Sequence, residues 1–321
     1  MTAKTAARAA LTALAASTWL AACTGIDQLV PEDPGHELTQ VPFFPQTIHQ
    51  CGPAALATVL GTSGVNATPE QLAPLVYIPG RRGSLQVEML AAARSRGRVA
   101  YVIEPAFSAV QAELAAGTPV LVLQDLGALG IRRWHFAVVI GFDPERDVVI
   151  LRSGTRRRHI LRRSDFLRTW QAGSNWAAVV TPPERPPATA TGSGFIRALA
   201  DTERNLPRSA VEAGHAAALE RWPADPLVLL ANGNDAYASQ RLADAIRLYR
   251  DLLANDPGNV AGRNNLANAL LDAGCARAAL AEAQQAAAQL GPEAPLGEPV
   301  RDTLEKATAA AGSDDSLCSA E

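Results

Sequence analysis

Cys51 and His135 are the two residues whose types could together cleave a peptide bond. Cys51 follows an extended, proline-bounded segment, and at Gly52-Pro53 the chain changes into an apolar run spaced like a buried helix. Proline is tolerated in the first helical turn because the N–H that it lacks would have no partner there. The pattern predicts that Cys51 lies at a helix start, where unpaired N–H groups and the helix dipole favour the thiolate form.

His135 is the histidine best placed to take the proton of that thiol. It opens the run 134–143, which is β-branched and aromatic, ends in a Gly/Asp/Pro turn and is typical of a buried strand. His49 is too close to Cys51 in sequence to face it across a cleft, and His159 lies in an arginine-rich strand that we expect to be solvated. The remaining histidines are His36 and His215.

Both residues also have a structural interpretation. Free cysteine is among the most buried residue types, so Cys51 could be a small apolar residue at a helix end. His135 could be a histidine held by ordinary hydrogen bonds. Each alternative explains one residue alone, whereas the presence of both favours catalysis.

Three elements taken together resemble a known family. They are Gln46, then Cys51-Gly52-Pro53-Ala54-Ala55-Leu56, and then, well separated from these along the chain, His135-Phe136-Ala137-Val138-Val139. This order resembles the papain-like cysteine peptidases that cut bacteriocin leader peptides after double glycine. The resemblance covers roughly residues 41–182 and implies a papain-like fold. It also implies that Cys51 attacks, that His135 acts as base and then acid, and that the Gln46 side chain and the Cys51 N–H form the oxyanion hole.

The chain departs from that family at the residue that orients the histidine. The family usually has an acidic residue, often followed by proline, after the strand that follows the histidine strand. Here the predicted strand 148–151 is followed by Arg152-Ser153-Gly154, and Asp143-Pro144 belongs to an earlier turn. The candidates are Ser153, a backbone carbonyl, a residue from elsewhere such as Asn175, or no residue at all.

The surrounding elements predict an α+β domain over residues 41–181. The capping pattern Thr68-Pro69-Glu70-Gln71 predicts a helix start. Apolar runs predict further helices over 84–95 and 107–116, and strands over 99–103, 119–124 and 176–180.

The N-terminus is predicted to be a signal peptide, residues 1–22. Lys4 and Arg8 precede an apolar stretch that ends in Leu-Ala-Ala-Cys at residues 20–23. This resembles the bacterial lipobox, which implies that Cys23 is acylated and anchors the protein to the lipid bilayer. The alternative is an ordinary cleaved signal with a chance cysteine. We therefore expect an extracytoplasmic lipoprotein, on the outer membrane facing the periplasm if the organism has two membranes, with residues 23–40 as a tether.

Residues 182–194 are rich in proline and then glycine, which predicts a linker. Beyond it, residues 195–310 are alanine-rich and self-similar, most clearly over 226–259 and 260–292, where small residues recur at one constant interval (Gly233 and Ala267, Ala245 and Ala279). The units resemble tetratricopeptide repeats. That resemblance implies an all-α module that binds a protein or peptide, whereas an unrelated alanine-rich bundle is the alternative. Residues 311–321 are predicted to be a disordered tail.

Composition restricts the remaining partners. The net charge of −3 gives no overall basic balance. The arginine-rich stretch 152–168 is predicted to be a solvated strand face, or alternatively a site for acidic peptides or lipid headgroups, and it lacks the interleaved aromatic residues of a nucleic-acid platform. No cysteine or histidine spacing matches a zinc site and no glycine-rich phosphate loop is present, so we predict no cofactor. Cys275 and Cys318 are candidates to pair in an oxidising compartment.

The sequence thus predicts a membrane-anchored extracytoplasmic cysteine peptidase with a helical repeat module. A cell-wall amide hydrolase is a rival, but such papain-like enzymes resemble Asp-Cys-Ser-Gly at the nucleophile, where this chain has Gln50-Cys51-Gly52-Pro53. A catalytically inactive papain-like shell that acts as a binding or assembly lipoprotein is the other alternative. The missing acidic residue favours this shell, and the presence of Gln46, Cys51 and His135 argues against it.

Overall fold

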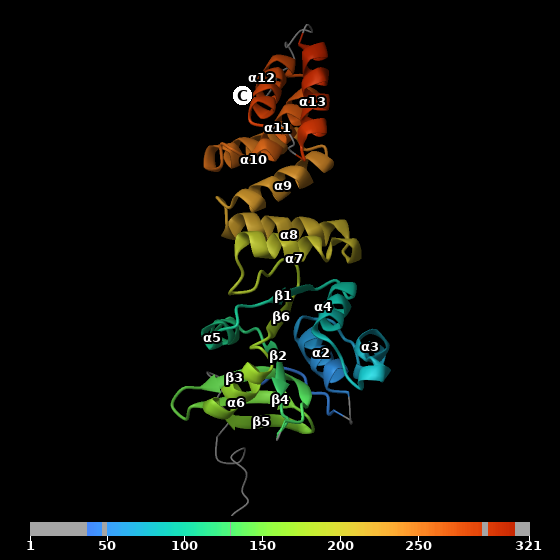
Figure 1. Cartoon of the computed structure of the whole chain (residues 1–321), viewed down its shortest axis with the longest axis vertical. Helices are drawn as coiled ribbons and strands as arrows, with labels where there is room; N and C mark the ends of the chain where they lie inside the picture. The colour runs from blue at the N-terminus through green and yellow to red at the C-terminus, as the bar shows by residue number, and fades with distance from the viewer. Residues whose placement is uncertain (1–36, 47–49, 129, 291–294, 312–321) are drawn as a thin grey trace, which may run out of the picture. The chain divides into compact units, whose positions relative to one another are not determined.

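The computed structural model of the chain describes residues 37–46, 50–128, 130–290 and 295–311. These residues form two compact units (Figure 1). The first unit comprises residues up to 92 together with 102–179, and the second comprises residues 93–101 together with those from 180 onward. The predicted signal peptide, the lipidation site Cys23, and Cys318 lie outside the described residues.

The N-terminal half contains helices and strands in the order predicted for an α+β domain. Helix α2 begins at Cys51 and is buried almost all round because its residues are nearly all apolar. Thr68 caps α3 through the predicted capping box with Gln71. The helices are α2 (Cys51–Thr62), α3 (Pro69–Val76), the 3-10 turn η2 (Pro79–Arg81), α4 (Gln86–Ser95), α5 (Phe107–Ala115) and α6 (Arg163–Ala172).

Six strands form one sheet in the order β1-β6-β2-β3-β4-β5. They are β1 (Val99–Val102), β2 (Val120–Asp125), β3 (Trp134–Asp143), β4 (Val148–Ser153), β5 (Arg156–Arg162) and β6 (Ala177–Thr181). The strands from β2 to β5 are antiparallel neighbours in chain order, and β6 pairs antiparallel with β2. Residues 99–101 of β1 and residues 180–181 of β6 are counted in the second unit.

The register of this sheet determines which side chains meet at the end of the sheet where β3 begins. His135 pairs with Gln124 at the end of β2, and Val138 pairs with Arg152 near the end of β4. A bulge between Val139 and Gly141 shifts the β3–β4 register. Because neighbouring strands run in opposite directions, the first residues of β3 and the last residues of β4 lie at the same end of the sheet.

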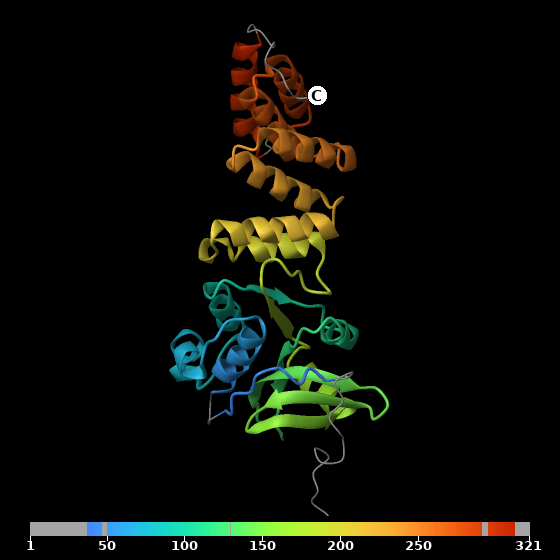
Figure 2. The ribbon, with the colours of Figure 1, turned by 180° about the vertical axis from the view of Figure 1, so that it is seen from behind.

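Helices cover the sheet and seal its core. Helix α2 packs against β2, β3 and β4, as the blue helix beside the green strands in Figure 2 shows. Helix α6 packs against β2, β4 and β5. Aromatic side chains join α5, α6 and β3: Phe107 lies edge-on to Phe142 at 5.2 Å between ring centroids and contacts Phe166 at 5.9 Å. The catalytic candidates therefore sit on elements fixed by a packed core.

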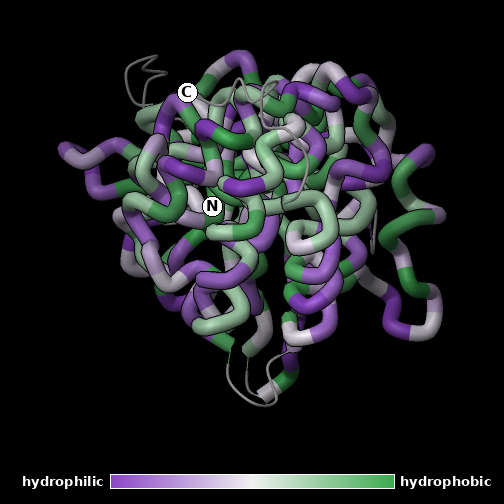
Figure 3. The backbone as a smooth tube through the Cα atoms, turned by 90° about the horizontal axis from the view of Figure 1, so that it is seen from above, coloured by the Kyte–Doolittle hydropathy of each residue, from purple (hydrophilic) through white to green (hydrophobic). Residues whose placement is uncertain are grey.

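From residue 192 onward, the described part of the second unit is built of helices joined by turns. Its helices are α7 (Gly192–Ala200), α8 (Arg208–Arg221), α9 (Pro226–Ala238), α10 (Leu242–Asn255), α11 (Val260–Asp272), α12 (Ala276–Ala288) and α13 (Gly297–Ala310). Helix α7 thus begins within the predicted linker. Gly233 lies against the ring of Tyr249, where a side-chain carbon would overlap, so the small residue permits close packing of α9 and α10. Hydrophobic and hydrophilic residues are closely mixed along the backbone, as amphipathic helices require (Figure 3).

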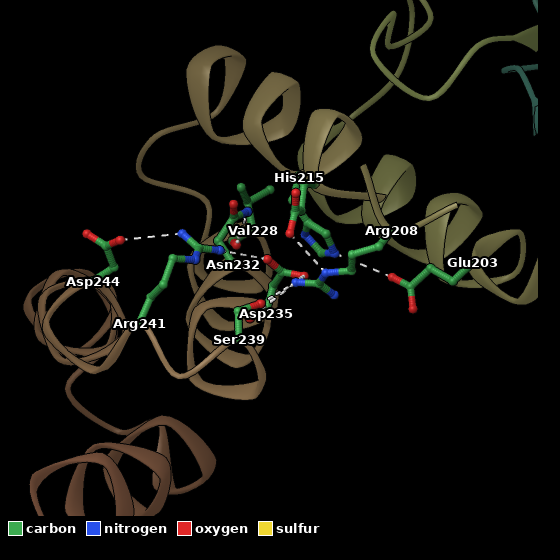
Figure 4. A network of polar contacts seen from close by, with 10 residues as sticks. Glu203, Arg208, His215, Val228, Asn232, Asp235, Ser239, Arg241 and Asp244 are labelled. Atoms are coloured by element: carbon green, nitrogen blue, oxygen red, sulfur yellow. Dashed lines mark hydrogen bonds and ion pairs between the residues drawn. The ribbon is translucent and has the colours of Figure 1, made fainter. Parts of the chain in front are cut away.

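Polar contacts also join α8, α9 and α10. Asp235 on α9 forms ion pairs with Arg208 at 2.6 Å and with Arg241 at 3.0 Å (Figure 4). Only 7% of the Asp235 side chain is exposed, compared with about half of each arginine. Arg208 also pairs with Glu212 and Arg241 with Asp244, so the charges of both arginines are compensated within the chain.

Among the residues that the structure describes, no helix has both the length and the apolar character needed to cross a bilayer. Cys275 is buried and disulfide-bonded.

Candidate active site

Cys51 is the first residue of α2, which confirms the predicted helix start. The next residue, Gly52, lies against Ser84, and a side-chain carbon at position 52 would overlap the Ser84 hydroxyl. The loop before α4 therefore approaches the start of α2 closely enough that only glycine fits. That hydroxyl is buried and has no hydrogen-bond partner among the described residues.

His135 is the second residue of β3, and the described contacts show what orients it. Its Nε2 lies 2.9 Å from the hydroxyl of Ser153, the last residue of β4. Ser153 is one of the several candidates that the sequence offers for this position. Asn175, another candidate, lies in the turn after α6 with a left-handed backbone (φ 50°). A neutral hydroxyl thus contacts the imidazole where the resembling family usually has a carboxylate.

A backbone hydrogen bond holds Gln46 beside the end of β4. Its N–H donates to the carbonyl of Gly154, in the turn between β4 and β5, at 3.0 Å. The side chains of Gln46, Cys51 and His135 then line one cleft of about 1050 Å³, whose lining residues all belong to the first unit. The three residues singled out in the sequence are therefore brought together around one space.

Burial controls the ionisation of the pair. Desolvation raises the pKa of the Cys51 thiol, and backbone hydrogen bonds from Phe136 and from the start of α2 act in the opposite direction with smaller effect. Desolvation, together with the positive charge of Arg133 and the nearby His159, lowers the pKa of His135 to about 4. The expected lowering of the Cys51 pKa is therefore wrong for this structure: near neutral pH the thiol and the imidazole are both uncharged.

Sequence reasoning did not assign the cleft arginines to the site. Two come from the loop around η2, Arg81 and Arg82, and two precede β3, Arg132 and Arg133. Each occurs as an Arg-Arg pair next to a glycine-containing turn, and that is the only sequence signal. Their convergence on one cleft depends on the tertiary fold.

The predicted solvated face in the stretch 152–168 is wrong for two of its arginines, Arg152 and Arg158. Arg152 is only 3% exposed and donates to the backbone carbonyls of Thr39, Val41 and Arg157. Arg158 forms an ion pair with the buried Glu37 at 2.8 Å. These two arginines therefore hold the segment 37–41 against the sheet.

Comparison with known proteins supports a peptidase fold for this region. Residues 38–178 match the model of the Peptidase_C39 like family. This part of the chain is similar to C39-like peptidases. The chain thus combines a sheet-containing domain of papain-like type with a C-terminal helical region. A comparison with curated proteins finds no match.

Three solved structures are similar to this chain. A putative C39-like peptidase from Bacillus anthracis shares 16% identity over 48% of this chain and 100% of its own, with a TM-score of 0.39. The peptidase domain of Streptococcus ComA, a bi-functional ABC transporter involved in a quorum sensing pathway, shares 18% over 44% and 99%, with a TM-score of 0.37. A double glycine motif protease from an AMS/PCAT transporter, in complex with the leader peptide, shares 20% over 47% and 96%, with a TM-score of 0.35.

Within the described part of the chain, no group of histidine, cysteine and acidic side chains is arranged to hold a metal ion.

Proposed function

We propose that this protein is a membrane-anchored, extracytoplasmic cysteine peptidase in which Cys51 is the nucleophile and His135 the general base and acid. The observation that carries the proposal is that Gln46, Cys51 and His135 line one cleft within a region similar to C39-like peptidases. Anchoring through an acylated Cys23 rests on the lipobox-like sequence alone.

The reaction begins from the neutral pair. Nε2 of His135 is engaged by Ser153, which leaves Nδ1 to accept the thiol proton as sulfur attacks the substrate carbonyl carbon. The carbonyl oxygen becomes an oxyanion, and the Cys51 N–H and the Gln46 side chain are the donors proposed to stabilise it, each by about 3 kcal/mol. When the C–N bond breaks, the leaving amine takes the proton from His135 and a thioester remains on Cys51.

Water completes the cycle. His135 removes a proton from water as the oxygen attacks the thioester carbonyl, and the proton returns to the Cys51 sulfur as the acid product leaves. Ser153 acts as a positioning residue in both steps, because its hydroxyl fixes the ring but supplies no negative charge to stabilise the imidazolium.

A peptide library tests this proposal. The full chain, Cys51→Ala and His135→Ala are incubated with a proteome-derived peptide mixture near pH 7, and new termini are identified by mass spectrometry. We expect cleavage by the wild type, none by Cys51→Ala, and a loss of about a hundredfold or more in His135→Ala. Cleavage that persists in Cys51→Ala would contradict the proposal.

The helical region is proposed to be a tetratricopeptide-type module that holds a protein or peptide. Helix α11 follows α9 at the same interval by which α12 follows α10, and this interval equals the sequence spacing of Gly233 and Ala267. The caps of α9 and α11, Asp225 and Asn259, repeat the interval, and both accept a backbone hydrogen bond. If this module holds the substrate, KM is lower for a protein substrate than for a short peptide with the same cleaved bond. Equal KM values would argue against this role.

A binding role without catalysis is the second candidate. Ser153 in place of a carboxylate and the raised pKa of the Cys51 thiol both favour it. It predicts that peptides bind in the cleft but remain intact after prolonged incubation, a result that the same library reports directly.

A further inference from the structure

One wall of the cleft presents Arg81 and Arg82 in a constrained loop. The loop is closed by an isolated bridge between Ile78 and Gly83, and Arg82 has a left-handed backbone (φ 49°). Both arginine side chains are exposed and line the cleft. The closed loop therefore fixes the backbone from which both arginine side chains project.

The second wall presents Arg132 and Arg133 at the start of β3. Asp125, at the end of β2, accepts hydrogen bonds from the backbone N–H of Arg133 at 2.8 Å and of Gly127 at 2.9 Å. The same carboxylate pairs with the Arg132 guanidinium at 3.0 Å, and that guanidinium also lies over the ring of Trp134 at 5.5 Å. Asp125 thus uses its charge to fix the turn that carries both arginines.

The cleft carries positive charge that no carboxylate in its described lining compensates. Its described lining contains four arginines and neither aspartate nor glutamate. Of the four, only Arg132 has a carboxylate partner among the described residues, and that carboxylate is Asp125. Arg81, Arg82 and Arg133 are exposed to the cleft without one. Guanidinium groups bind carboxylates in a bidentate fork, so such a cleft favours an anionic occupant.

Apolar side chains line the same cleft as the four arginines. Leu85, Leu123, Leu126 and Trp134 lie along it, beside the pair of Cys51 and His135. A compact anion would meet one wall and leave the other wall and this apolar surface unused. An extended peptide with carboxylates separated by apolar residues would use all three.

We propose that this cleft selects acidic peptides, with aspartate or glutamate side chains on both sides of the residues that lie over Cys51. One group of carboxylates pairs with Arg81 and Arg82, and the other pairs with Arg133. As a statement about a substrate, the inference rests on the proposed peptidase function, but the binding preference can be measured without cleavage.

Binding to the full chain carrying Cys51→Ala tests the inference first. This protein is immobilised and incubated with the proteome-derived peptide mixture, and retained peptides are sequenced. We expect enrichment of aspartate and glutamate on both sides of an apolar centre. The best binder is then compared with a twin that has glutamine or asparagine at each acidic position, and we expect at least a tenfold loss of affinity that diminishes as salt is added.

Arginine variants assign the preference to the cleft. Arg81→Gln and Arg82→Gln are expected to weaken binding of the acidic peptide about threefold to tenfold each, with little effect on its neutral twin. Arg157→Gln is the matched control, because Arg157 is also exposed in the first unit but does not line the cleft. An equal loss for both peptides, or an equal loss in the control, would overturn the inference, as would retention of peptides without acidic enrichment.

The two proposals fail in different ways. Cleavage of neutral and acidic peptides at equal rates, dependent on Cys51, would support the peptidase and overturn the acidic preference. Arginine-dependent binding of acidic peptides without cleavage by the wild type would support the acidic preference and reject the peptidase. Enrichment only of peptides whose acidic groups lie on one side of the apolar centre would overturn the two-wall arrangement.

Discussion

The arginines of the two units have different surroundings. In the helical unit, Asp235 pairs with both Arg208 and Arg241 (Figure 4). Each arginine also has a carboxylate of its own, Glu212 for Arg208 and Asp244 for Arg241, so their charges are compensated within the chain. In the cleft, Arg81, Arg82 and Arg133 have no carboxylate partner among the described residues. Arginines that are paired with carboxylates in the helical unit thus connect helices. The arginines of the cleft that lack a carboxylate partner give the cleft a positive charge that favours an anionic ligand. Removing a charge should therefore affect stability in the first region and binding in the second.

The largest expected effect concerns His135 and tests the burial of the cleft region. Its folded pKa of about 4 lies below the ordinary value of 6.5, so the unfolded chain binds the proton more readily. The full free energy of unfolding is therefore present above pH 6.5, where His135 is neutral in both states. It falls by about 3 kcal/mol in total as pH is lowered toward 4. Denaturant unfolding of the wild type and His135→Gln at pH 7 and pH 4 should show this difference between the two proteins. Parallel pH dependence would show that the imidazole is not desolvated.

Gly52→Ala should impair the cleft, because the added methyl group would displace the Ser84 loop from the nucleophile. Because reacting groups must be held within about 1 Å, we expect kcat/KM to fall about a hundredfold. Gly80→Ala is the control, since a methyl group there meets no other atom within 4 Å. Comparable kcat/KM values for the wild type and Gly52→Ala would show that the loop adapts to the added methyl group.

Asp235→Asn tests whether the paired arginines of the helical unit contribute to stability. It leaves Arg208 and Arg241 without their shared carboxylate, and because both arginines are half-exposed we expect a loss of only about 1 to 2 kcal/mol in unfolding free energy. Thermal unfolding measures this loss, and cleavage of short peptides should remain unchanged. Arg81→Gln should change stability by less than about 0.5 kcal/mol. Equal destabilisation by both variants would remove the distinction between the two sets of arginines.

Ser153 gives the smallest expected effect. Ser153→Ala removes the hydroxyl that orients His135 and should lower kcat about tenfold with little change in KM. Ser153→Asp places a carboxylate beside the imidazole, which should raise the pKa of His135 and move the acid limb of the pH–rate profile to higher pH. Unchanged profiles in both variants would mean that Ser153 does not position the ring.

Local sequence was sufficient for the residues that begin elements. The position of Cys51 at a helix start and of His135 at a strand start follows from proline, apolar spacing and β-branched residues. The constant offset between helix starts in the second unit is likewise visible in Gly233 and Ala267. Ser153 was visible only as one candidate among several, because its contact with His135 depends on strand register and on the bulge in β3.

Properties set by tertiary burial could not be read from the sequence. The helix start suggested a thiolate at Cys51, but desolvation by the packed domain outweighs the local N–H groups. Arg152 belongs to an arginine-rich run typical of a solvated face, yet it is buried against backbone carbonyls of residues 39–41, which lie far earlier in the chain.

The most direct test of the account changes one atom. Cleavage of the best library peptide is measured with the wild type and with Cys51→Ser, after both are shown to unfold at the same temperature. A hydroxyl gives up its proton far less readily than a thiol, and a neutral imidazole of low pKa without a carboxylate partner is a weak base for it. We predict that cleavage falls at least a thousandfold. Cleavage by Cys51→Ser within tenfold of the wild type would contradict the assignment of Cys51 as the nucleophile.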